Sequence, residues 1–167
     1  GLCWATSSAK YFVNWKVEVT PINDISNDPD TIIIKGTETN KKQLFSQELN
    51  LKDQRLFINL DSKALGDNIA WIPYVETFRQ KWGCKVIVST FWNNLFVEKY
   101  PELEFVNPGS VAHNLYAQYK IGCFDNDFTR NKNNWREIPL QKVAADALGL
   151  NFVELRPKVT VIDTPRP

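Results

Sequence analysis

The sequence contains no methionine, a single histidine and only three cysteines among its 167 residues. Cys3, Cys84 and Cys123 are far apart and form no CxxC pair, so their spacing predicts neither a zinc site nor a disulfide framework. Free thiols in a reducing cytoplasm are the expectation. Because His113 is the only histidine, a Ser-His or Cys-His catalytic arrangement could form only around that ring. The missing initiator methionine indicates a fragment or a processed chain.

Charge and hydrophobicity exclude further classes of protein. The net charge is +1, opposite charges are interspersed and no run of five like charges occurs, so we expect no nucleic-acid or membrane-surface partner. No apolar stretch approaches the roughly 18 residues of a transmembrane helix. No glycine-rich phosphate loop or Walker motif is present, so we expect no nucleotide cofactor bound by this chain alone. The aromatic content of 13% indicates an ordered globule.

The sequence pattern of the first third of the chain predicts a small β module. Residues 13–19 alternate apolar and polar side chains, and residues 31–36 and 43–49 also have strand-like patterns. Polar loops join these segments, which favours three short antiparallel strands that need another surface to cover them. We therefore divide the chain into a β module (1–53), an α/β domain (54–162) and a linker or end (163–167).

The α/β domain opens with a strand, a turn and a helix. Residues 56–60, Leu-Phe-Ile-Asn-Leu, are an apolar run typical of a strand buried on both faces of a parallel sheet. Apolar residues at helical spacing follow, namely Trp71, Val75, Phe78 and Trp82. They predict a helix packed on the sheet and closed by Gly83. The turn at 61–67 then lies at the carboxyl edge of the sheet, where the positive end of the helix dipole can bind ligands.

Asp67 lies at or just inside the start of this helix, and two interpretations of it stay open. As an N-cap, its carboxylate would accept hydrogen bonds from the N–H groups of Ile69 or Ala70. As a general base, it would take a proton from a substrate hydroxyl at the sheet edge. The two roles are compatible, and Gly66 would let the backbone approach a ligand closely.

A second parallel strand is predicted at 84–90, and its carboxyl end carries four candidate substrate-binding residues: Ser89, Thr90, Trp92 and Asn93. Alternatively, Ser89 and Thr90 cap a short helix at 91–100. Further on, the patterns predict strands at 104–107 and 115–121, a brief helix at 110–116, a polar loop at 123–135, a helix from Pro139 to Gly149, and strand-like runs at 151–155 and 158–162. Arg130 and Lys132 in this loop, and Arg136 just after it, would either meet an anionic group or remain solvated.

The expected fold is therefore α/β, a Rossmann-like parallel sheet with flanking helices, preceded by a small antiparallel β module. Residues 60–76, Leu-Asp-Ser-Lys-Ala-Leu-Gly-Asp-Asn-Ile-Ala-Trp-Ile-Pro-Tyr-Val-Glu, resemble the first β-α unit of the bacterial O-heptosyltransferases that modify autotransporter adhesins. These enzymes are related to the lipopolysaccharide heptosyltransferases of glycosyltransferase family nine. The similarity continues through 86–93, 119–122 and 138–144, so it covers roughly residues 54–158.

This resemblance implies the N-terminal, acceptor-side half of a GT-B fold, with the catalytic base at Asp67. It implies an inverting, metal-independent transfer from an ADP-heptose-like donor to a sugar acceptor such as a protein Ser/Thr or a glycan. The donor would sit mainly in a C-terminal Rossmann-like domain, so this part alone should be inactive. Leu65 and Gly66 would lie close to the sugar, while Lys63 would contact the donor diphosphate or simply face solvent. The cysteine-bound iron of those relatives has no clustered counterpart in this sequence.

A different class of function also fits the residues. A non-catalytic α/β module could bind carbohydrate or protein through aromatic side chains such as Trp92, Tyr116 and Trp135. A stand-alone flavodoxin-like protein ranks last, because the sequence shows no phosphate cradle.

Overall fold

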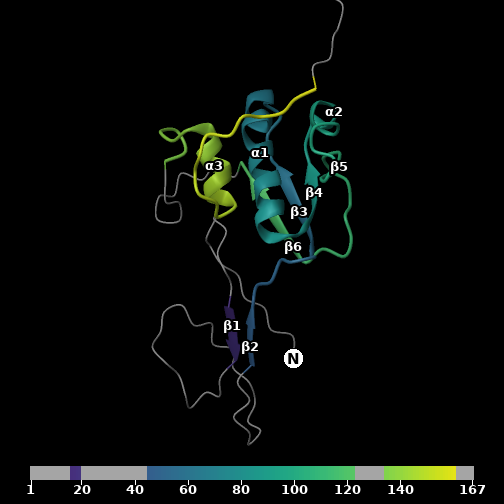
Figure 1. Ribbon diagram of the computed structural model, residues 1–167, viewed down its shortest axis with the longest axis vertical. Coiled ribbons are helices and arrows are strands. Elements are labelled where there is room, and N and C mark those ends of the chain that lie inside the picture. The colour runs from purple at the N-terminus through teal and green to yellow at the C-terminus, as the bar shows by residue number, and fades with distance from the viewer. Residues whose placement is uncertain (1–15, 20–44, 123–133, 161–167) are drawn as a thin grey trace, which may run out of the picture. The chain divides into compact units, whose positions relative to one another are not determined.

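The computed structural model describes residues 16–19, 45–122 and 134–160, which fall into two compact units (Figure 1). The first unit contains β1 (Lys16–Val19) and β2 (Phe45–Glu48). They pair antiparallel, with Lys16 opposite Glu48, and the three-stranded β module stays a prediction. The third predicted strand, at 31–36, lies outside the described residues. The domain division at 53 and 162 stays a prediction.

The second unit, from Leu51 onward, is built on a four-stranded parallel sheet, in agreement with the predicted Rossmann-like fold. Its strands are β3 (Arg55–Leu60), β4 (Lys85–Ser89), β5 (Glu104–Val106) and β6 (Ala117–Ile121). The spatial order is β5-β4-β3-β6, so the chain adds two strands on one side of β3 and then places β6 on the other. In open α/β sheets, ligands bind at the carboxyl ends of the strands where the order reverses, here between β3 and β6.

Helix α1 (Leu65–Trp82) crosses the sheet between β3 and β4 and buries the face formed by Leu56, Ile58 and Leu60. The ring of Phe78 in α1 meets that of Tyr119 in β6 edge-on at 5.4 Å. The residues of β3 that alternate with Leu56, Ile58 and Leu60 point to the other face of the sheet and are only half-buried. The expectation that β3 is buried on both faces is therefore wrong for that face. The physical reason is that α1 packs against one side of the sheet only.

The end of α1 and the start of α3 (Leu140–Ala147) are marked by a glycine and a proline, respectively. Gly83 ends α1 in the left-handed conformation, with φ of 60°, and its N–H donates to the carbonyl of Arg79, which confirms the predicted cap. Helix α3 lies beside α1, and the indole N–H of Trp71 donates to the carbonyl of Leu140 at 3.0 Å (Figure 1). Pro139 immediately precedes α3, where a missing N–H costs nothing.

After α3 the chain continues to residue 160 as an extended segment without helix or strand, drawn in yellow in Figure 1. Two tyrosine side chains hold it: the hydroxyl of Tyr74 in α1 donates to the carbonyl of Val153, and the hydroxyl of Tyr100, beyond the end of α2, accepts the N–H of Lys158. The strand prediction at 151–155 is therefore wrong, and so is the described part of the run at 158–162. The backbone groups of this segment bond to side chains such as Tyr74 and Tyr100 and to the carbonyl of Leu95, and not to a neighbouring strand.

Two short helices also differ from expectation. The predicted helix at 91–100 is reduced to α2 (Asn93–Phe96) and turns. The predicted helix at 110–116 does not form. That segment is held by Arg55 of β3, whose guanidinium donates to the carbonyl of His113 and whose own carbonyl accepts the N–H of Tyr116. Because these two hydrogen bonds hold the segment beside the start of β3, its backbone does not fold into a helix.

Candidate functional site

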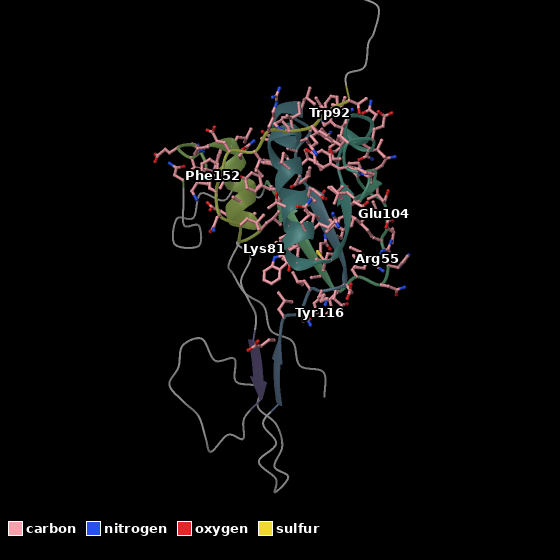
Figure 2. All side chains as sticks on the ribbon, in the orientation of Figure 1. Arg55, Lys81, Trp92, Glu104, Tyr116 and Phe152 are labelled. Atoms are coloured by element: carbon pink, nitrogen blue, oxygen red, sulfur yellow. The ribbon has the colours of Figure 1, made fainter. Side chains whose placement is uncertain are left out.

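The candidate site lies at the carboxyl end of the sheet, where β3, β4 and the first turn of α1 meet. Figure 2 shows Trp92 at this end and Arg55 at the opposite end of the parallel strands. Asp67 is the third residue of α1 and is half-buried. Its side chain lines a pocket of about 610 Å³. The other lining residues are Trp135, Arg136, Ile138 and Leu140. The carboxylate therefore borders a space large enough for a ligand instead of being sealed in the core.

The interpretation of Asp67 as an N-cap is wrong. Ala64 occupies the N-cap position, because α1 starts at Leu65 and thus includes Gly66. Its backbone N–H donates to the Ser62 hydroxyl oxygen at 3.1 Å, and that hydroxyl donates to Oδ2 of Asp67 at 2.5 Å. The Asp67 carboxylate is thus placed in the first turn of α1, where the helix dipole favours negative charge.

A buried amide ties this turn to the end of β4. Asn68 is fully buried, and its Nδ2 donates to the carbonyls of Ser62 and Ala64 at 2.9 and 2.8 Å. Its Oδ1 accepts the hydroxyl of Thr90 at 2.6 Å, and the same hydroxyl oxygen accepts the N–H of Trp92. Such fully bonded polar groups inside a protein fix one geometry, because breaking one bond leaves a buried group unpaired.

The residues predicted at the end of β4 lie in three different surroundings. Ser89 and Thr90 are buried, with 2% and 0% exposure. The indole N–H of Trp92 donates to the carbonyl of Lys63 at 3.1 Å, which links the two loops at the sheet edge. Asn93 donates through Nδ2 to Oδ1 of Asn107 at 2.9 Å. Direct contact of these four residues with a substrate stays a prediction.

The turn residues before Asp67 lie at the surface. Leu65 is 39% exposed, and Gly66 has open space where a side chain would lie. The amino group of Lys63 lies 5.6 Å from the centre of the Phe91 ring, an exposed cation–π contact. The backbone around Gly66 is therefore accessible to a ligand.

The loop before α3 contributes a stacked pair, Trp135 and Arg136, to the pocket wall. The guanidinium of Arg136 lies 4.5 Å from the ring centre of Trp135. Arg130 and Lys132, the other predicted anion contacts, lie outside the described residues. The pocket thus combines a carboxylate, a cation and aromatic and aliphatic surface, which is the usual make-up of a site for a polar organic ligand.

Sequence reasoning missed Ser62 and Asn68. Asn68 precedes Trp71 by three residues and Ile72 by four, so it lies on the apolar stripe of α1, and a polar residue on such a stripe signals a buried hydrogen-bonded group. The role of Ser62 has no comparable signal, because its hydroxyl meets Asp67 only once the turn is folded.

Among residues 16–19, 45–122 and 134–160, no group of three or more His, Cys, Asp or Glu side chains could hold a metal ion. Over the same ranges, no helix combines the length and the apolar character needed to cross a bilayer. Cys84 is a buried free thiol.

The second unit has a Rossmann-like fold, in which helices flank a four-stranded parallel sheet. One similar solved structure is the iron-containing dodecameric glycosyltransferase TibC from enterotoxigenic Escherichia coli, with a TM-score of 0.76 at 24% identity; the match covers 98% of this chain and 39% of that one. A second structure of TibC, in complex with ADP-D-beta-D-heptose, gives a TM-score of 0.74. The parallel sheet and its helices thus match a glycosyltransferase fold.

Curated relatives also resemble this chain in sequence. The chain is 29% identical over 154 residues to the autotransporter heptosyltransferase TibC of E. coli O78:H11, and 29% identical over 162 residues to the autotransporter heptosyltransferase Aah of E. coli. A Citrobacter rodentium autotransporter heptosyltransferase, BAHTCr, is 26% identical over 152 residues. The matches cover 89%, 95% and 89% of this chain. The chain is thus a homologue of the bacterial autotransporter heptosyltransferases.

The similarity to the heptosyltransferases is partial. The chain spans about a third of the length of the curated relatives it matches, 34%, 37% and 33% respectively. No protein-family model matches it. The solved relative is described as iron-containing, but the described residues of this chain offer no matching ligand set, and we assign no step to iron.

Proposed function

We propose that this chain is the N-terminal, acceptor-binding part of an inverting glycosyltransferase that uses a nucleotide-sugar donor, with Asp67 as the general base. The homology to heptosyltransferases supports the class of reaction. The observation that carries the residue assignment is the Asp67 carboxylate, which lines an open pocket at the carboxyl edge of a parallel sheet.

The chemistry needs one carboxylate on the acceptor side. Asp67 takes the proton of the acceptor hydroxyl as its oxygen attacks the anomeric carbon of the donor sugar. The new C–O bond forms on the face opposite the leaving group, the bond to the diphosphate oxygen breaks, and the nucleoside diphosphate leaves with the electron pair. The acceptor proton ends on Asp67, and the configuration at the anomeric carbon inverts.

The pocket walls suit a hydroxyl-rich acceptor. The Trp135 ring and the Leu140 side chain offer apolar surface to the C–H faces of a sugar or a peptide side chain. Leu65 and Gly66 present accessible backbone beside Asp67, and Trp92 and Asn93 border the same edge of the sheet. In this proposal, the buried Ser89 and Thr90 support the site indirectly.

The donor belongs to the remainder of the enzyme in this proposal. TibC binds ADP-D-beta-D-heptose, and we propose a donor of that kind, held mainly by a C-terminal Rossmann-like domain. Lys63 is then a contact for the leaving diphosphate. We also propose a cytoplasmic location, supported by the free thiol of Cys84.

The test is Asp67→Asn in the protein encoded by the complete reading frame. ADP release from ADP-D-beta-D-heptose is followed with a Ser/Thr peptide or an oligosaccharide as acceptor. Removal of the base should lower kcat by about 10²- to 10⁴-fold with an unchanged unfolding midpoint. The matched control is Asp61→Asn, a carboxylate at the same edge that pairs with Lys120 at 2.6 Å, and its kcat should stay within a few fold. Equal kcat for Asp67→Asn and the parent would remove Asp67 from this role.

A non-catalytic carbohydrate-binding module is the second candidate, favoured by the half-buried Trp135 ring in the pocket wall. The structure weakens it in one respect. Figure 2 shows Trp92 and Tyr116 at opposite ends of the parallel sheet, so these two rings cannot form one stacking platform. Calorimetric titration of oligosaccharides into the Asp67→Asn variant separates the candidates. Binding without any turnover in the parent protein would favour the module.

A further inference from the structure

We propose that Ser62 is a positioning residue that releases Asp67 from helix capping and fixes its carboxylate for proton transfer. The inference rests on the proposed function, because it assigns to Ser62 the orientation of the base. Neither the sequence patterns nor the resemblance singled out this residue.

An acidic side chain at this position of a helix normally takes part in N-terminal capping. In a capping box, the acidic side chain at the third helical residue reaches back and accepts the backbone N–H of the N-cap residue. Asp67 is the third helical residue of α1, and Ala64 is the N-cap. Here the N–H of Ala64 donates to Oγ of Ser62 at 3.1 Å instead. Ser62 therefore accepts the N–H that would otherwise occupy the carboxylate of Asp67.

The same contact directs the hydroxyl proton of Ser62. Because Oγ accepts the N–H of Ala64 from one side, its own proton is available to the second neighbour, Oδ2 of Asp67 at 2.5 Å. A carboxylate that accepts a hydroxyl at this distance is held in one rotamer. Within the described part of the chain, Oδ1 of Asp67 has no hydrogen-bond partner, so it is the oxygen left to receive the proton of an acceptor.

Ser62 can hold Asp67 only because it is itself held. Its N–H donates to the carbonyl of Leu60 at 2.9 Å, and its carbonyl accepts Nδ2 of Asn68 at 2.9 Å. Asn68 is fully buried and bonded to the Thr90 hydroxyl at the end of β4. The orientation of Asp67 is thus fixed through Ser62 to two strands of the sheet, which is the preorganisation that a catalytic group needs.

The hydrogen bond from Ser62 to Asp67 can also persist when Asp67 is protonated. When Asp67 has taken a proton on Oδ1, Oδ2 remains an acceptor for the Ser62 hydroxyl, so no bond in the turn must break between the two protonation states. Ser62 neither gains nor loses a proton in the cycle, and its part is the geometry of the base.

The test compares Ser62→Ala with Ser62→Thr in the protein encoded by the complete reading frame. ADP-D-beta-D-heptose is the donor probe, and the acceptor is the one used for Asp67→Asn. A misplaced base should lower kcat of Ser62→Ala by about 10- to 100-fold with KM unchanged. Ser62→Thr keeps the hydroxyl and should retain kcat within about threefold. The matched control, Ser110→Ala in an exposed turn, should equal the parent.

A double variant separates positioning from general structural damage. If Ser62 acts only through Asp67, adding Ser62→Ala to Asp67→Asn should lower kcat no further. If Ser62→Ala lowers the unfolding midpoint, Ser62→Cys, which keeps the size but is a weak donor, replaces it with the same expected loss.

The outcomes distinguish this inference from the proposed function. A large loss in Asp67→Asn together with parent-like kcat in Ser62→Ala overturns the positioning role and leaves the base intact. A full additional loss in the double variant overturns it equally. Parent-like kcat in Asp67→Asn refutes the proposed function itself, whatever Ser62 does.

Discussion

The indole ring of Trp71 occupies the space into which a side chain at Gly122 would project. A Cβ added at Gly122 would lie 3.0 Å from Trp71 and 3.1 Å from the carbonyl oxygen of Asp61, and the φ of Gly122 is +97°. This glycine follows β6, and the N–H of Asp61 donates to the carbonyl of Ile121 beside it. Helix α1 can therefore approach the switch point between β3 and β6 only because residue 122 has no side chain.

Gly122→Ala should lower the free energy of unfolding by about 2 to 4 kcal/mol, from backbone strain and overpacking together. The measurement is urea unfolding followed by tryptophan fluorescence. Gly109→Ala is the matched control, because Gly109 also has positive φ, +87°, but open space around it. Its cost should be about 1 kcal/mol, from the backbone alone. Equal costs at the two positions would show that Trp71 is not the obstacle.

Thr90→Val should destabilise the protein although valine matches threonine in shape. The change leaves Oδ1 of the buried Asn68 and the N–H of Trp92 without their partner, at a cost of about 1 to 3 kcal/mol. Urea unfolding should show a lower midpoint with an unchanged slope. Asn94→Ala, at an exposed position of α2, should change stability by less than about 0.5 kcal/mol. Parent-like stability of Thr90→Val would mean that the network contributes nothing.

Stability should fall as the pH rises from about 9 to 11. Burial raises the pKa of the Cys84 thiol from 9.0 to about 11. Between these values the unfolded thiol has lost its proton while the folded one keeps it, so the unfolded state binds fewer protons and raising the pH favours it. The thermal midpoint of Cys84→Ala should therefore lie below that of the parent at pH 8, and the gap should narrow by pH 11.

Tyr119→Phe is the comparison for this experiment. Burial raises the pKa of Tyr119 from 10.0 to about 12, so its effect should begin about one pH unit higher. A gap for Cys84→Ala that stays constant from pH 8 to 11 would exclude the thiol as the titrating group.

Tyr74→Phe should loosen the extended segment after α3 without unfolding the sheet. The Tyr74 hydroxyl donates to the carbonyl of Val153, and burial raises the pKa of Tyr74, so the hydroxyl stays a donor at neutral pH. Hydrogen exchange of the Leu155 amide should quicken by about 5- to 30-fold, which corresponds to roughly 1 to 2 kcal/mol. Tyr100→Phe, which removes the anchor of Lys158, should instead affect the far end of the segment. Identical exchange maps for the two variants would show that the anchors do not act locally.

Much of the α/β fold was predictable because its signals are local and strong. The apolar run at 56–60 and the helical spacing from Trp71 to Trp82 record burial directly, and both elements form where predicted. The failures lie where a segment's partners are distant in sequence. Residues 151–155 have a strand-like composition, yet they bond to Gln141 and Tyr74, and nothing local could reveal that.

In the candidate site, too, the sequence revealed some residues, whereas others were revealed only by the folded structure. From the sequence, Asp67 was recognisable as a carboxylate at or just inside the start of a helix at a sheet edge, whereas the predicted turn at 61–67 is shorter, because α1 already begins at Leu65. Its neighbours were not recognisable, because Ser62 meets Asp67 five residues away only in the folded turn, and Thr90, which follows β4, meets Asn68 of α1, 22 residues away.

By itself, the sequence determined the class of fold, since hydrophobic periodicity dictates which faces must be buried, and it determined the family that the first β-α unit resembles. The tertiary structure alone decided the state of Asp67: freed from capping by Ser62 and open to a pocket whose other wall, Trp135 and Arg136, lies some seventy residues away. The physical reason is that a carboxylate's role depends on which groups its oxygens face, and those groups come together only when the chain packs.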